Sequence, residues 1–131
     1  MTFQSRHLCV SIDRPLGEVY DFLATPENWP TWAPGLGTSI AKLNGEWVAE
    51  SPMGRIKVAF VERNQFGILD HDVTLPSGET VRNHFRAVPN GDGCELMFTL
   101  FQRASMSEEM FAEDAKAVTR DLEQLKTILE S

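Results

Sequence analysis

The first third of the chain changes from strand-like alternation to helical spacing. Apolar and polar residues alternate over 3–12, which predicts a strand with one buried face. That face is formed by Leu8, Val10 and Ile12. An Asp-x-Pro sequence at 13–15 and a Thr-Pro sequence at 25–26 are both typical of helix starts. We therefore predict two short helices, the second ending near Trp32 before a loop at 33–37.

From residue 38 onward the pattern returns to short strands separated by turn residues. Six strands are predicted, at 38–43, 46–51, 55–62, 67–75, 79–88 and 93–103. The turns between them include Asn44-Gly45, Pro52-Met53-Gly54, Pro76-Ser77-Gly78 and Asn90-Gly91-Asp92-Gly93. Short connections of this kind join antiparallel neighbours, so we expect the six strands to form a meander.

The last quarter of the chain carries one apolar stripe at helical spacing, which predicts a helix over 107–130. The stripe consists of Phe111, Ala115, Val118, Leu122, Leu125 and Leu129. Ser105 and Glu108 have the spacing of a capping box at the helix start. A coiled coil is the alternative interpretation. The preceding strands favour a helix packed on a sheet, because they need a cover and no other long helix is predicted.

Charged residues indicate which face of each strand meets solvent. The residues placed outside are Asp70, Asp72, Thr74, Arg82, His84 and Arg86, together with Met97 and Phe101. The inward residues include Trp47, Ala49, Ile56, Val58, Phe60, Leu69, Val73, Leu75, Val81, Phe85, Ala87, Leu96, Phe98 and Leu100. His71 and Asn83 are the polar exceptions on this inward face.

This order of elements predicts an α+β fold. A curved seven-stranded antiparallel sheet wraps around the long C-terminal helix, with two short helices after the first strand. The 131 residues form a single domain, 1–131. Apolar walls with few polar groups are typical of a ligand cavity. The alternative is that the same side chains fill the core.

Composition narrows the classes of partner. The formal net charge is −7, which disfavours nucleic acid and stable membrane association. No apolar run approaches the ~18–20 residues of a membrane span, and 1–12 lacks the pattern of a secretory signal, so we expect a cytoplasmic protein. Cys9 and Cys94 lie far apart without a zinc-binding spacing, and we expect both to be buried free thiols rather than a disulfide.

Several stretches are similar to one known superfamily. They are Ile12-Asp13-Arg14-Pro15, Val19-Tyr20-Asp21-Phe22-Leu23, Pro26-Glu27-Asn28-Trp29-Pro30-Thr31-Trp32, Leu69-Asp70-His71, Gly93-Cys94-Glu95, Asp121-Leu122 and Leu125-Lys126. The whole chain resembles the START-like (SRPBCC) helix-grip superfamily, and within it the bacterial polyketide cyclase/dehydrase-like branch. The resemblance implies a deep apolar cavity for a small hydrophobic or aromatic molecule, lipid or polyketide-like, and no fixed cofactor.

His71 is the main candidate for chemistry. A neutral imidazole among aromatic side chains is suited to bind a ligand oxygen or to act as a general base. Asn83 on the next strand is placed to hold a ligand oxygen or to orient His71. The structural alternative is a core histidine bonded to Asn83 or to water. We expect no metal site, because consecutive strand residues such as Asp70, His71 and Asp72 point to opposite faces.

Two further groups lie near the expected cavity. Asp114 and Asp121, seven residues apart on the long helix, are either solvated carboxylates or acidic helpers of His71. Trp29 and Trp32, with the loop that follows, form either a lid over a ligand or a plug at that end.

Three hypotheses of function follow. The first is a binding protein for a small hydrophobic or aromatic molecule. The second is a cyclase- or dehydratase-type enzyme with His71 as general base, and the third is an interaction module with a filled core. The expected ligand-binding residues are Trp32, Trp47, Phe60, Leu69, His71, Asn83, Phe85, Phe98, Phe111 and Asp114. The chain is expected to be a monomer or a homodimer, and a homodimer would form either through the sheet edge or through the outward Met97 and Phe101.

Overall fold

The computed structural model describes residues 1–33 and 37–131. Its elements are β1 (Ser5–Ile12), α1 (Leu16–Leu23), the 3-10 helix η1 (Pro26–Asn28), α2 (Trp29–Trp32), β2 (Ser39–Leu43), β3 (Glu46–Ser51), β4 (Gly54–Phe60), β5 (His71–Thr74), β6 (Thr80–Asn90), β7 (Gly93–Phe101) and α3 (Glu108–Glu130). The predicted order of one strand, short helices, six strands and a long helix is therefore confirmed.

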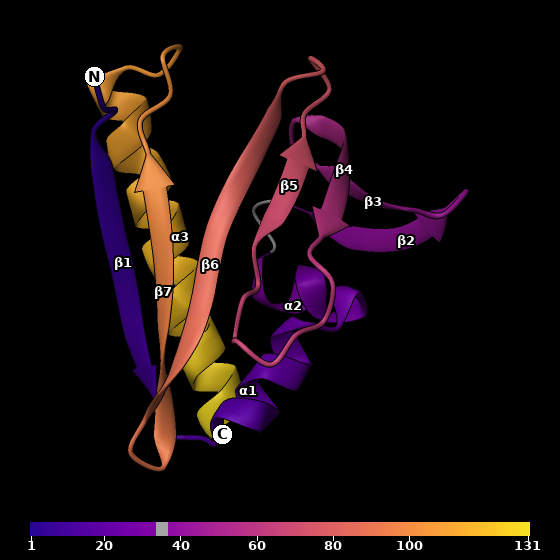
Figure 1. Cartoon of the computed structure of the whole chain (residues 1–131). Helices are drawn as coiled ribbons and strands as arrows, with labels where there is room; N and C mark the ends of the chain where they lie inside the picture. Colours follow the sequence, from indigo (N-terminus) through magenta and orange to yellow (C-terminus); the bar gives the residue numbers. More distant parts are fainter. Residues whose placement is uncertain (34–36) are drawn as a thin grey trace.

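The seven strands form one antiparallel sheet in the order β1-β7-β6-β5-β4-β3-β2. The chain folds as a meander from β2 to β7, and β1 pairs with β7 at the edge, with Leu8 opposite Phe98. α3 runs along β1 and β7, and α1 and α2 lie at the end of the sheet where α3 finishes (Figure 1). This is the predicted helix-grip-like α+β arrangement.

Some predicted boundaries differ from the structure. β5 begins at His71 rather than at residue 67, because the segment before it pairs with β6 only through an isolated bridge between Ile68 and Arg86. The cap of α3 is Ser107, not Ser105. Its hydroxyl oxygen accepts from the Met110 amide at 3.1 Å, and its backbone is extended as an N-cap requires.

The concave face of the sheet has a filled end and an open end. At the filled end, next to α1 and α2, inward side chains are fully buried: Phe85, Ala87 and Leu96 against Trp29, Leu122 and Leu125. At the open end, beside the first half of α3, inward side chains of the same two strands are only half-buried: Val81, Asn83, Phe98 and Leu100. On β6 and β7 the fully buried inward residues therefore lie at one end, whereas Ile56 and Val73 on the neighbouring strands and Phe111 on α3 are buried as well.

No helix among the described residues is both long and apolar enough to cross a membrane.

Candidate functional site

An aromatic cluster surrounds His71 at the filled end. We define this cluster as Trp29, Trp32, Phe60, His71 and Phe85. The Trp29 ring meets His71 edge-on at a centroid distance of 5.2 Å, and it meets Trp32 at 5.3 Å. The tryptophans come from α2 and the other three side chains from the sheet, so the cluster joins the short helix to β4, β5 and β6. Of the two alternatives for the tryptophans, this packing is that of a plug.

Both ring nitrogens of His71 have partners. Nδ1 lies 3.0 Å from the carbonyl oxygen of Leu69, which can only accept, so this nitrogen carries the proton. Nε2 lies 3.2 Å from the side-chain nitrogen of Asn83 and accepts from it. The tautomer is thus assigned from the partners. Burial lowers the pKa of His71, against a smaller raising effect of the Leu69 bond, so the ring is held neutral.

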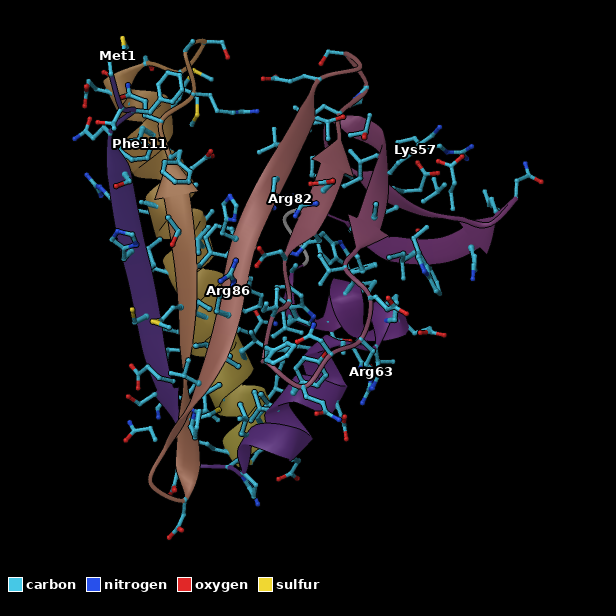
Figure 2. All side chains as sticks on the ribbon, in the orientation of Figure 1. Met1, Lys57, Arg63, Arg82, Arg86 and Phe111 are labelled. Carbon is cyan, nitrogen blue, oxygen red and sulfur yellow. The ribbon has the colours of Figure 1, made fainter. Side chains whose placement is uncertain are left out.

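Asp70 is buried, and the expectation of a solvated carboxylate on this strand is wrong. It is 3% exposed. Its Oδ1 accepts from the Phe85 amide at 2.9 Å, and its two oxygens accept from the Arg86 guanidinium at 3.1 and 3.0 Å. Burial by itself would raise the pKa of Asp70, but these hydrogen bonds hold it at about 2. Figure 2 shows Arg86 projecting from β6.

The dipeptide Asp70-His71 replaces one step of the strand ladder. The Leu69 amide donates to the Phe85 carbonyl at 2.8 Å, and a regular antiparallel pair would return a bond from the Phe85 amide to Leu69. Here the Phe85 amide is bound by the Asp70 carboxylate, and the Leu69 carbonyl takes the His71 proton instead. Asp70 and His71 therefore fix this part of the sheet from its two faces.

A small cavity of about 40 Å³ lies against the aromatic cluster. Its walls include Tyr20, Leu23, Trp32, Phe60, Leu69, His71 and Phe85. A volume of this size holds about one or two water molecules, whereas ligand pockets span roughly 300–1,000 Å³. An organic ligand therefore needs either displacement of the plug or the open end of the concave face.

The structure brings most of the expected site residues together and separates three of them. Trp32, Phe60, Leu69, His71, Asn83, Phe85 and Phe98 are contiguous, with Phe98 5.8 Å from Phe85. Trp47 lies on β3, half-buried, with the Lys42 ammonium 5.8 Å from its ring. Phe111 is buried with the Arg6 guanidinium over its ring, and Asp114 is exposed on α3. Residues 34–36 of the expected loop are outside the described part of the chain.

Sequence reasoning placed Trp29 in a lid or plug but did not include it among the ligand-binding residues, and it missed Tyr20 and Arg86 as residues of this region. Tyr20 lines the cavity, and its hydroxyl accepts from the Asn64 amide at 2.8 Å. The signal for Trp29 was present, because a tryptophan one helical turn before Trp32 shares its face. Arg86 gave no such signal, since it occupies an ordinary outward position of β6.

The hydrogen bonds of His71 suit it to hold neighbouring groups in position rather than to transfer a proton. Neither ring nitrogen of His71 is free to take a proton from a substrate, because Nδ1 is protonated and Nε2 is bound to Asn83. Among the described residues no group of three His, Cys, Asp or Glu side chains is placed to hold a metal ion. Cys9 and Cys94 are both free thiols, but the expectation that both are buried is wrong for Cys9, which is exposed.

Comparison with solved structures shows the same fold at low identity. DynU16, from the dynemicin biosynthetic locus, superposes with a TM-score of 0.74 at 13% identity over 97% of this chain. This chain spans 47% of the length of that protein. A START superfamily protein from Mycobacterium smegmatis superposes with a TM-score of 0.70 at 12% identity, over 96% of this chain and 97% of that one. The Zhui aromatase/cyclase from a Streptomyces species superposes with a TM-score of 0.69 at 13% identity, over 97% of this chain and 94% of that one.

No curated protein matches the chain. A family model does, over residues 6–130, and its description is polyketide cyclase / dehydrase and lipid transport. The match covers nearly all of the sequence and agrees with the START-like fold of the solved structures. The chain therefore belongs to the polyketide cyclase/dehydrase and lipid transport family.

Proposed function

We propose that this protein binds a small, uncharged, apolar or aromatic molecule at the open end of the concave face, between the sheet and α3. One observation carries the proposal. Phe98, Leu100 and Val81 face inward but are only half-buried. The inward residues Leu96 and Phe85, two to four positions away on the same strands, are fully buried. Apolar side chains left uncovered on an inner face are typical of a binding site.

The chemistry of the surrounding residues supports an aromatic or lipid-like ligand. Phe98 and Phe85 lie 5.8 Å apart and provide ring faces for stacking. Asn83 lies at the boundary between the open and filled ends, and its bond to His71 uses only one of its amide hydrogens. The amide oxygen and the second N–H are thus suited to hold one polar atom of the ligand, with His71 as the residue that orients Asn83.

Two matched variants of β6 test this proposal. Val81→Trp fills the open end from within, whereas Val88→Trp places the same ring on the outer face, where Val88 is 37% exposed. The probe is N-phenyl-1-naphthylamine, an uncharged aromatic dye whose emission rises in apolar surroundings. We expect Val81→Trp to weaken probe binding at least tenfold and Val88→Trp to leave it unchanged. Equal binding by both variants, or no binding by the unmodified protein, would overturn the proposal.

A further inference from the structure

A second, separate groove lies on the other flank of α3, along the edge strand β1. Its volume is about 480 Å³. We call it the basic groove and define it by its lining: Arg6 and Leu8 from β1, and Ala112, Glu113, Ala115, Lys116, Thr119 and Arg120 from α3. β1 and α3 run side by side at this edge of the molecule (Figure 1). The groove shares no residue with the open end of the concave face.

The charge of this groove is opposite to that of the chain. The formal net charge is −7, yet three of the eight lining residues are cationic and one is acidic. Glu113 lies 3.5 Å from Lys116, which leaves the two arginines without a carboxylate inside the groove.

Arg6 and Arg120 are exceptional among the cations of this protein. Four cationic side chains in the described chain have no carboxylate side chain within 4.0 Å: Arg6, Arg14, Lys42 and Arg120. Arg14 binds carbonyl oxygens at the end of α3, and Lys42 lies over Trp47. The remaining two both line the basic groove. In a chain with 19 acidic residues, this placement of two guanidinium groups indicates a site for an external anion.

The floor of the groove is apolar. Leu8, Ala112 and Ala115 form it, and the two alanines leave room against the helix backbone. The guanidinium carbon of Arg6 lies 5.4 Å from the centroid of the Phe111 ring. This stacking holds the guanidinium by its face and leaves the N–H groups at its edge free to donate. An occupant that satisfies both surfaces has an anionic head and an apolar body.

We propose that the basic groove binds a long-chain carboxylate, with its head on Arg120, Lys116 or Arg6 and its chain on the alanine floor. A volume of 480 Å³ falls within the range of small-molecule sites. A planar guanidinium matches the geometry of a carboxylate. This site is independent of the uncharged ligand proposed for the concave face.

The test is a titration of the isotope-labelled protein with sodium decanoate below its micelle concentration, followed by amide NMR. We expect shifts at residues 6–8 and 112–120, and at least a tenfold loss of affinity in the double variant Arg6→Gln/Arg120→Gln. Arg55→Gln is the matched control, because Arg55 is exposed and paired with Glu50 on a distant strand. It should bind decanoate as the unmodified protein does.

Two further experiments distinguish binding at the basic groove from binding at the concave face. The Val81→Trp variant should keep decanoate binding at the basic groove, and 1-decanol should bind there at least tenfold more weakly than decanoate. Because Arg6 also packs on Phe111, Lys116→Gln/Arg120→Gln serves as a second groove variant. Shifts confined to the concave face, equal binding of decanol, or full affinity in both groove variants would each overturn the proposal.

Discussion

The two ends of the concave face are built on the same strands and differ in what covers them. At the filled end, Trp32 from α2 packs on Phe85 and Trp29 packs on Trp32, so the side chains there form a core. At the open end, Phe98 and Asn83 face inward from the same strands with no comparable cover. The tryptophans of this four-residue helix therefore contribute to the burial of this part of β6, whereas inward residues farther along β6 and β7 stay partly accessible.

Removal of the plug residue should have the largest effect. Trp29 is 1% exposed, so Trp29→Ala is expected to lower the free energy of unfolding by about 4 kcal/mol. Phe98→Ala, the matched truncation at the open end, should cost about 1–2 kcal/mol because Phe98 is only half-buried. Urea unfolding measures both. Similar losses in the two variants would show that both ends are equally packed.

The buried carboxylate beside the aromatic cluster should have the next largest effect. Asp70→Ala leaves the Phe85 amide and Arg86 without their acceptor, and we expect a loss of about 3 kcal/mol. The neighbouring Asp72 binds Arg82 at 2.8 Å where Arg82 is exposed and Asp72 is partly exposed to solvent, so Asp72→Ala should cost less than about 1 kcal/mol. Equal unfolding midpoints in urea for the two variants would contradict the structural role assigned to Asp70.

The order of elements, the antiparallel meander and the apolar face of α3 could be predicted from the sequence, because each depends on local periodicity. The inward direction of His71 and Asn83 followed from the same alternation, and the structure pairs them. The burial of Asp70 could not be predicted. It depends on the segment at 67–69 lying beside β6, with Arg86 over the carboxylate, and no local pattern encodes that contact. The filling of one end by Trp29 is likewise a tertiary property.

The boundary between the two ends is sensitive to Asn83. In Asn83→Leu the Nε2 of His71 loses its donor inside the core, which should cost about 1–2 kcal/mol. Nitrogen NMR of the His71 ring should show Nε2 still unprotonated at pH 7, because burial keeps the pKa low. Asn90→Leu, at an exposed position of the same strand, is the control. Unchanged stability of Asn83→Leu would mean that the His71–Asn83 bond does not join the two ends.

The smallest expected effect is a gain in stability on replacement of Asp121, which lies on α3. Burial raises the pKa of this carboxyl from 3.8 to about 6. A raised pKa means that ionisation costs more in the folded state than in the unfolded state, so this penalty grows as the pH rises from about 4 to 6 and stays constant above 6.

Asp121→Asn removes the penalty. Because Asp121 is only half-buried and therefore screened by solvent, we expect a gain of about 1 kcal/mol at pH 7.5 that disappears near pH 4. Urea unfolding at both pH values, with the exposed Glu123→Gln as control, measures this difference. A gain of the same size at both pH values would show that the carboxyl charge is not its cause.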